Sequence, residues 1–228
     1  MLALVNSLLP SEALHTLSRH AQVLPFHTQD ITHHALSGHA DLFFSPLPHT
    51  WVAAPNAPAA IVNQLLSLGV SITTGLTPVS TLTPTLGAYN VAVAPSFAIA
   101  NPHYLDPVLR THLAPRTIIP TRQGMCRCNA ICLGDAVLTS DPGIAQACLH
   151  HHIPHLLVDA SPILLPGYRS GCLGGCCGIS GSTLFLIGHL SHHPQGQLIQ
   201  MFLKEHSIRL VQLYNGPLLD LGSILFAN

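Results

Sequence analysis

Short apolar runs alternate with turn residues and amphipathic segments along the whole chain of 228 residues. One block holds the apolar runs "DLFFSP" (41–46) and "HTWVAAP" (49–55), the amphipathic segment "APAAIVNQLLSLG" (57–69) and the run "VSITTG" (70–75). Short apolar runs bounded by turn residues are typical of strands, and apolar positions three and four apart are typical of a helix. The block therefore predicts a unit of two strands, a helix and a third strand.

The same layout recurs along the rest of the chain. Copies cover residues 89–121, 126–159 and 171–215, and the two chain ends, 218–228 and 1–26, together supply a fifth. The first strands of the third and fourth copies are expected in "CRCNAICLG" and "GCLGGCCGIS". Units of this size bury their apolar faces by packing against neighbours, so five of them, joined through the chain ends, predict a ring. The predicted fold class is α/β, a single domain whose five sheets pack around a central axis with the helices outside.

Residues that start helices agree with these units. Ser140 or Asp141 precedes Pro142, and such a pair caps the free N–H groups of a helix whose first turn accepts proline. Ser11 is expected to cap in the same way, with the Glu12 carboxylate near the positive helix end.

Glycines mark the predicted ends and turns. Gly69 follows an amphipathic segment and predicts a helix stop. The sequences "LGD" (133–135) and "SGS" (180–182) predict hairpin turns between paired strands.

Charge is scarce, which limits the classes of partner. Charged residues make up 7% of the chain, the formal net charge is −1, and Lys204 is the one lysine beside 17 histidines. Without a basic run, the sequence argues against binding to nucleic acid. The low surface charge favours self-association as a homo-oligomer.

Hydropathy and cysteine usage suggest a compartment. No apolar run approaches the roughly 18 residues that span a bilayer, and the start of the chain lacks the basic residues of a signal peptide. Seven cysteines are an odd number for a disulfide framework. We therefore expect free thiols in a reducing, cytoplasmic compartment, with no membrane partner.

Several stretches, in this order and spacing, resemble a known fold family: "HADLFF" (39–44), "YNVAV" (89–93), "RQGMCRCNA" (122–130), "LTSDPGI" (138–144), "LPGYRSGCLGGCCG" (165–178), "GHLSHHP" (188–194) and "PLLDLGSIL" (217–225). The chain resembles an uncharacterised bacterial family of the pentein, or guanidine-group-modifying enzyme, fold. That resemblance implies a five-bladed propeller with a pocket on its axis.

The catalytic set of the pentein enzymes is largely missing. The resemblance implies a cysteine nucleophile in the last unit, where Leu225 or Phe226 stands, and a histidine in the third unit, near Met125. The carboxylate of the first unit is kept as Asp41. The sequence therefore predicts a pentein without the usual guanidine chemistry.

Metal binding is one alternative for the cysteines and histidines. Structural zinc needs four convergent ligands, often from Cys-x-x-Cys pairs. Here "CRC" (126–128) has one intervening residue, "CLGGC" (172–176) has three, and "HHHIPH" (150–155) lies at a helix end. These spacings favour buried strands and an exposed helix end, so we expect neither a metal nor another cofactor.

A relocated cysteine nucleophile is a second alternative. Cys128 follows Arg127, whose charge would lower the thiol pKa, and Cys172 is also placed near the axis. His39 is the candidate base for a hydrolase or transferase acting on an amidine or amide. Small, buried core cysteines explain the same pattern.

Non-covalent binding is the reading we favour. The first strands of the blades carry polar residues within apolar segments, and burying such groups is costly unless they are paired with each other or with a ligand. We expect Asp41 and Asp220 to bind a small polar or cationic metabolite, and a protein-interaction role stays open. The candidate ligand-binding residues are His39, Asp41, Asn90, Arg127, Asn215 and Asp220.

Overall fold

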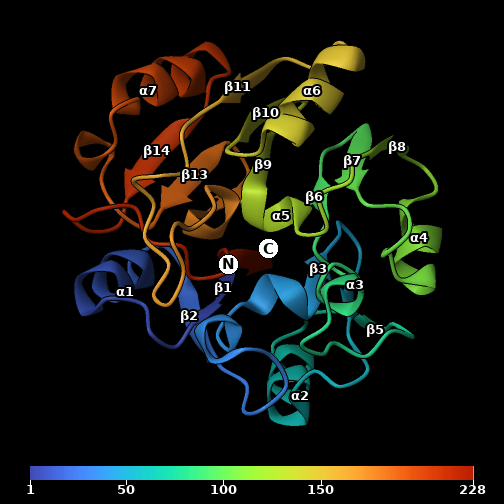
Figure 1. The fold of residues 1–228 in the computed structure, drawn as a ribbon. Helices are drawn as coiled ribbons and strands as arrows, with labels where there is room; N and C mark the ends of the chain where they lie inside the picture. Colours follow the sequence, from blue (N-terminus) through green and yellow to red (C-terminus); the bar gives the residue numbers. More distant parts are fainter. Residues whose placement is uncertain (228) are drawn as a thin grey trace.

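Five three-stranded sheets surround a central axis in the computed structural model, which describes residues 1–227 (Figure 1). Each sheet comes from one predicted unit, and its long helix lies on the outside of the ring. The units are β3 (Phe44–Pro46), β4 (Trp51–Ala53), α2 (Ala59–Ser67) and β5 (Ile72–Thr74); β6 (Ala92–Val93), β7 (Phe97–Ala100), α4 (Pro107–Leu113) and β8 (Thr117–Pro120); β9 (Ala130–Leu133), β10 (Ala136–Thr139), α6 (Pro142–His150) and β11 (His155–Leu157); β12 (Cys177–Ser180), β13 (Thr183–Leu186), α7 (Gly196–Glu205) and β14 (Arg209–Gln212); and β15 (Leu225–Ala227), β1 (Leu2–Asn6), α1 (Ser11–Ser18) and β2 (Gln22–Phe26).

The strands of every sheet pair in the same way. The first strand is antiparallel to the second, as in Phe44 opposite Ala53. The second is parallel to the third, as in Trp51 opposite Ile72, and the helix makes the crossover between them. The predicted repeat of two strands, a helix and a third strand is confirmed.

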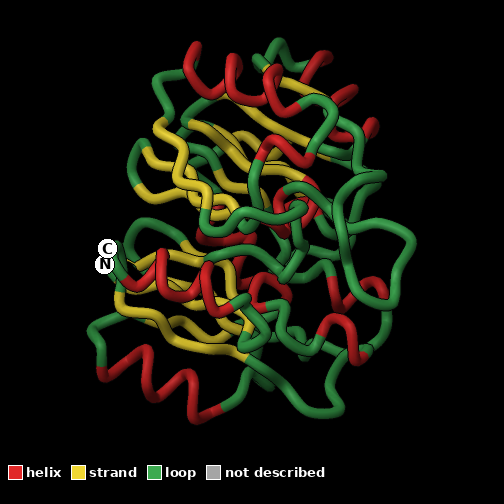
Figure 2. The backbone as a smooth tube through the Cα atoms, turned by 90° about the vertical axis from the view of Figure 1, so that its left-hand side faces the viewer, coloured by secondary structure: helices red, strands yellow, loops and turns green. Residues whose placement is uncertain are grey.

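The ring closes through the two ends of the chain. Leu2 pairs with Ala227 and Leu4 with Leu225 in an antiparallel ladder. Figure 2 shows the two termini side by side at one edge of the molecule. The fifth blade is therefore assembled from both ends, as the sequence predicts.

Short helical turns precede three of the inner strands: η2 (Ala40–Leu42), α5 (Cys126–Asn129) and η3 (Gly174–Cys176). The prediction that "CRC" and "GCLGG" begin strands is wrong, because both segments wind into turns before β9 and β12 start. The turns let backbone groups bond across blades, as Cys126 N does to Asn90 O at 3.1 Å. Extended chains of the same length would leave such groups unpaired in the crowded centre.

The remaining short helices lie in connections: η1 (His34–Leu36), α3 (Thr83–Leu86) and η4 (Leu190–His192). No helix among residues 1–227 has the length and apolar character needed to cross a bilayer.

The helix caps confirm one sequence prediction and correct another. Asp141 caps α6, because its carboxylate accepts a hydrogen bond from Ile144 N at 2.8 Å. Ser11 is not the cap of α1. Pro10 holds the N-cap position, and Ser11 is the first residue of the helix.

The predicted glycine turns are also present. Gly69 ends α2 at φ +85°, and Gly134 and Gly181 turn the hairpins at φ +65° and +56°. These backbone angles favour glycine because it has no Cβ.

Aromatic residues fill the space between the first and fifth blades. Phe26 of β2 packs on Phe43 and Phe44 with ring centroids 5.5 and 5.9 Å apart, and Phe44 packs on Trp51 at 6.1 Å. All four side chains are buried. This rigid packing supports the turn that carries Asp41.

Candidate binding site on the propeller axis

Two of the chain's nine acidic residues lie buried at the axis. Asp41 belongs to the turn η2, and Asp220 lies in the segment leading to β15; their exposed fractions are 0% and 1%. A buried carboxylate is costly unless donors surround it. The partners of these two aspartates therefore show what the site is built to hold.

Asp41 has donors on one oxygen and none on the other. Its Oδ2 accepts hydrogen bonds from the Ser223 hydroxyl at 2.6 Å and the Cys128 thiol at 3.1 Å. Its Oδ1 is buried and has no hydrogen-bond partner among residues 1–227. One oxygen of this carboxylate is left for a donor that the described chain does not supply.

Ser223 is a site residue that the sequence did not reveal. It is buried and holds a left-handed backbone at φ +67°, a conformation that serine seldom adopts. Its hydroxyl also lies 3.0 Å from Gly174 O, so the Asp41 contact of 2.6 Å is the shorter of the two. A serine at this position gives no sign in the sequence of a positive φ.

Asp220 forms the second half of the site, with His39. Its Oδ1 lies 3.3 Å from His39 Nε2 and accepts Gly222 N, while Oδ2 accepts Cys172 N at 2.8 Å. Both side chains are about 2% exposed, and His39 Nδ1 is buried without a partner among residues 1–227. A second polar atom near the axis is thus also unpaired.

The electrostatics of this pair favour the imidazolium. Burial alone would lower the pKa of His39, but the hydrogen bond and charge of Asp220, together with the charge of Asp41, outweigh it. The pKa of His39 is therefore raised above its ordinary value of 6.5.

Asn90 joins the two neighbouring blades at the axis. Its Nδ2 donates to Asp41 O at 3.0 Å and contacts Cys128 Sγ at 3.1 Å, while its Oδ1 accepts Cys128 N at 3.0 Å. Both amide groups are used within the chain, so Asn90 positions Asp41 and Cys128.

The two candidate cysteines are held as neutral thiols. Burial raises the pKa of Cys128 well above 9.0, and the charges of Asp41 and Asp220 raise it further. Burial and the same two carboxylates raise the pKa of Cys172 to about 12. Since the thiolate is the nucleophile, this setting opposes covalent chemistry. The hydrogen bonds of the Cys128 sulfur within residues 1–227 join it to Asn90 and Asp41, neither of which can act as the histidine base.

The structure places Arg127 and Asn215 apart from this cluster. The Arg127 guanidinium donates to the carbonyls of Gly174 and Cys177, both at 3.3 Å, and so ties the third blade to the fourth. Asn215 is exposed, and its backbone N–H faces Glu12. Among the predicted ligand-binding residues, four come together at the axis: His39, Asp41, Asn90 and Asp220.

Residues at the places of the missing enzyme groups have packing roles. Leu225 and Phe226 lie in β15, and Phe226 packs on Phe185 with ring centroids 5.0 Å apart. Met125 is the N-cap residue of α5.

The glycines of "GCLGGCCG" explain how the blades approach so closely. A Cβ on Gly175 would collide with the Asp220 carboxylate, and one on Gly174 would collide with Arg127 O. A Cβ on Gly222 would likewise collide with His39. The glycines of this stretch allow the fourth blade to pack closely against Asp220 and against the backbone of α5.

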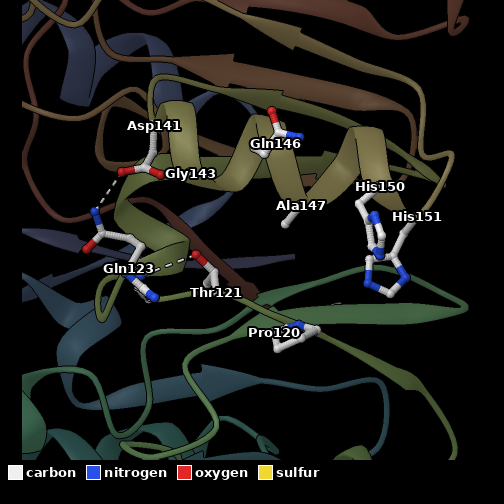
Figure 3. Close-up of a pocket in the computed structure, with 10 residues that line it drawn as sticks. Pro120, Thr121, Gln123, Asp141, Gly143, Gln146, Ala147, His150 and His151 are labelled. Atoms are coloured by element: carbon white, nitrogen blue, oxygen red, sulfur yellow. Dashed lines mark hydrogen bonds between the residues drawn. The ribbon is translucent and has the colours of Figure 1, made fainter.

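The histidine run lies away from the axis. A pocket of about 670 Å³ separates β8 from α6, and Figure 3 shows His150 and His151 at one end and Asp141 at the other. Asp141 Oδ2 accepts a hydrogen bond from Gln123 Nε2 at 2.9 Å. No group of three or more His, Cys, Asp or Glu within residues 1–227 is arranged to hold a metal ion.

Comparison with known families identifies the chain. Residues 4–225 match the family described as "Family of unknown function (DUF6873)". The chain belongs to the DUF6873 family. A search among curated proteins found none that matches.

Solved structures show which fold this DUF6873 protein has. Agmatine deiminase from C. jejuni, a cysteine-to-serine variant with substrate bound, is similar with a TM-score of 0.60 and 8% identity, covering 98% of this chain and 92% of that one. DDAH from Pseudomonas aeruginosa, a cysteine-to-serine variant complexed with citrulline, has a TM-score of 0.54 and 6% identity, covering 92% and 91%. SxtG, an amidinotransferase from Microseira wollei, has a TM-score of 0.54 and 10% identity, covering 92% and 87%.

These neighbours are guanidino-group-modifying enzymes of the pentein fold, and the DUF6873 chain shares that fold. The predicted five-bladed α/β architecture is confirmed. At identities of 6–10% the likeness extends to the fold alone, because one fold carries many functions.

Proposed function

We propose that this protein binds a small polar or cationic metabolite at the propeller axis through Asp41 and Asp220, without covalent chemistry. The observation that carries this proposal is the buried Asp41 Oδ1, which has no donor among residues 1–227. Leaving such an oxygen unpaired costs about 1–3 kcal/mol, more for a charged group. A ligand N–H would remove that cost.

The charge balance supports a cation. Two carboxylates and one imidazole share the axis, and the raised pKa of His39 favours its protonated form. The two carboxyl groups outnumber the one imidazole in this buried setting. A bound cation would find acidic partners there and gain the strong hydrogen bonds that charged partners form.

A thermal-shift screen of guanidino and amino compounds tests this proposal. We expect at least one compound to raise the melting temperature of the wild type with a concentration dependence that fits one site. Asp41→Asn keeps the shape of the side chain and should abolish the shift. Asp135→Asn, on an exposed carboxylate that bonds Ser96, is the matched control and should keep it.

The result that would overturn the proposal is a stabilising compound whose effect survives Asp41→Asn and Asp220→Asn. Absence of any stabiliser across a broad panel would also count against it and would favour the protein-interaction alternative.

The cysteine alternative makes a different prediction. A hydrolase or transferase using Cys128 or Cys172 needs a reactive thiolate, and both thiols have strongly raised pKa values. We expect a mild thiol electrophile at neutral pH to label both slowly. Labelling of either one far faster than the other five cysteines would restore the enzyme hypothesis.

We also propose a reducing, cytoplasmic location. It is supported by the seven cysteines, all of which are free thiols in the structure.

A further inference from the structure

A cavity of about 360 Å³ lies directly beside the axial site. Its walls come from four segments of the chain, 6–8, 27–38, 165–167 and 220–221. The second and third of these segments approach closely, since a methyl group at Gly167 would lie 3.6 Å from Ala35 Cβ. The volume is within the range of small-molecule sites. The lining residues are Asn6, Leu8, His27, His34, Ala35, Gly38, Leu165, Pro166, Gly167, Asp220 and Leu221.

The floor of the cavity adjoins the His39–Asp220 pair. Asp220 lines it, and Gly38, which precedes His39 in the chain, lines it as well. Asp220 Oδ2 accepts one hydrogen bond, from Cys172 N, so it keeps a lone pair for a second donor. Among the residues that line the cavity, Asp220 is therefore the acidic group that a ligand ammonium could approach.

The walls between floor and mouth are apolar. Leu165 and Leu221 are buried beside Asp220, and Leu8 and Pro166 are exposed at the rim. The side-chain amide of Asn6 is hydrogen-bonded within the chain: Nδ2 donates to Leu221 O, and Oδ1 accepts a hydrogen bond from Leu8 N. An apolar ligand body would find little polar competition along these walls.

The mouth carries no second negative charge. The exposed His27 and His34 lie there, and Asp220 is the one acidic residue among the described residues that line the cavity. A second positive charge on the same ligand would lie beside imidazole rings and apolar side chains, without a carboxylate partner. The cavity thus suits a ligand with its single positive charge at one end.

We propose, as an extension of the proposed function and resting on it, that this cavity holds the apolar body of a monoamine whose ammonium group reaches Asp220. The ligand class is a primary amine with a short hydrocarbon body. Diamines of the same length should bind more weakly, because the residues lining the cavity offer no second carboxylate for the second ammonium group. Neutral alcohols should also bind more weakly, because they carry no positive charge for Asp220.

Calorimetric titration with straight-chain amines from propylamine to hexylamine tests this assignment. Each methylene buried in the cavity should tighten binding about fourfold, given its transfer free energy from water. 1-Hexanol and 1,6-diaminohexane should bind at least tenfold more weakly than hexylamine. Ala35→Phe adds a ring to the wall of the cavity and should remove the chain-length dependence.

Controls separate this assignment from the axial proposal. Ala114→Phe adds the same side chain at an exposed position at the end of α4 and should leave the titrations unchanged. Melting curves of both variants verify folding. Amine binding that needs Asp220 but shows no chain-length dependence, or is unaffected by Ala35→Phe, would overturn the cavity assignment and leave the axial proposal standing. Binding of these amines that is unchanged in Asp220→Asn would overturn the cavity assignment, and binding that is unchanged in both Asp220→Asn and Asp41→Asn would overturn the axial proposal as well.

Discussion

Asp106 and Asp41 are both fully buried aspartates, yet their surroundings differ completely. Asp106 Oδ2 accepts hydrogen bonds from Leu76 N, Thr77 N and the Tyr89 hydroxyl, and Oδ1 accepts Val108 N and Leu109 N. Within residues 1–227, Asp41 has two donors on one oxygen and none on the other.

The difference separates a structural carboxylate from one available for binding. Asp106 caps α4 and fixes the loop after β5, so each of its oxygens is occupied by the fold. Asp41 is held just as firmly but keeps an unpaired oxygen inside the molecule. Sites that bind ligands commonly retain such locally unfavourable features, at some cost in stability.

The largest effect should come from removing each charge in turn. Asp106→Asn should lower the free energy of unfolding by about 3 kcal/mol, because an amide cannot accept all five bonds. Asp41→Asn should cost no more than about 1 kcal/mol, since it also removes a buried, partly unpaired charge. Urea denaturation measures both, and equal losses would contradict the contrast.

Deleting the hydroxyl donors sharpens the same comparison. Ser223→Ala should cost about 2 kcal/mol, because Asp41 then keeps one donor, the Cys128 thiol. Tyr89→Phe should cost about 1 kcal/mol, since Asp106 retains its four backbone donors. The reverse order in urea melts would mean that Asp106 depends on Tyr89 more than its contacts imply.

The smallest effect is expected in the pH dependence of stability. Burial raises the pKa of Asp106, but hydrogen bonds from Leu109, Leu76 and Thr77 outweigh it and lower that pKa below 3.8. Its contribution is present above pH 3.8 and is lost as the pH falls through the folded pKa. The raised pKa of His39 gives the opposite sign: its contribution is full below pH 6.5 and is lost as the pH rises through the folded pKa.

The variant His39→Gln isolates the second titration. The stability difference between wild type and variant should be largest below pH 6.5 and shrink as the pH rises, measured by urea melts across that range. A difference that grows with pH would show that His39 is neutral beside Asp220.

The layout of the blades could be predicted because each strand and helix has its own apolar pattern. The turns at the axis could not, since four residues such as Cys126–Asn129 are too few to show helical periodicity. Asp41 and Asp220 stood out as rare charges in apolar segments. Ser223 did not, because its role depends on a left-handed backbone, and Arg127 looked like a ligand group although the carbonyls of the fourth blade occupy it.

The most direct test of the account is a high-resolution crystal structure with the tightest-binding amine or guanidino compound. We predict a nitrogen of that compound at about 3 Å from Asp41 Oδ1 or Asp220 Oδ2, with the blades unmoved. A compound seated elsewhere, with both carboxylates keeping only the contacts described above, would contradict the claim that the axis is a cation-binding site.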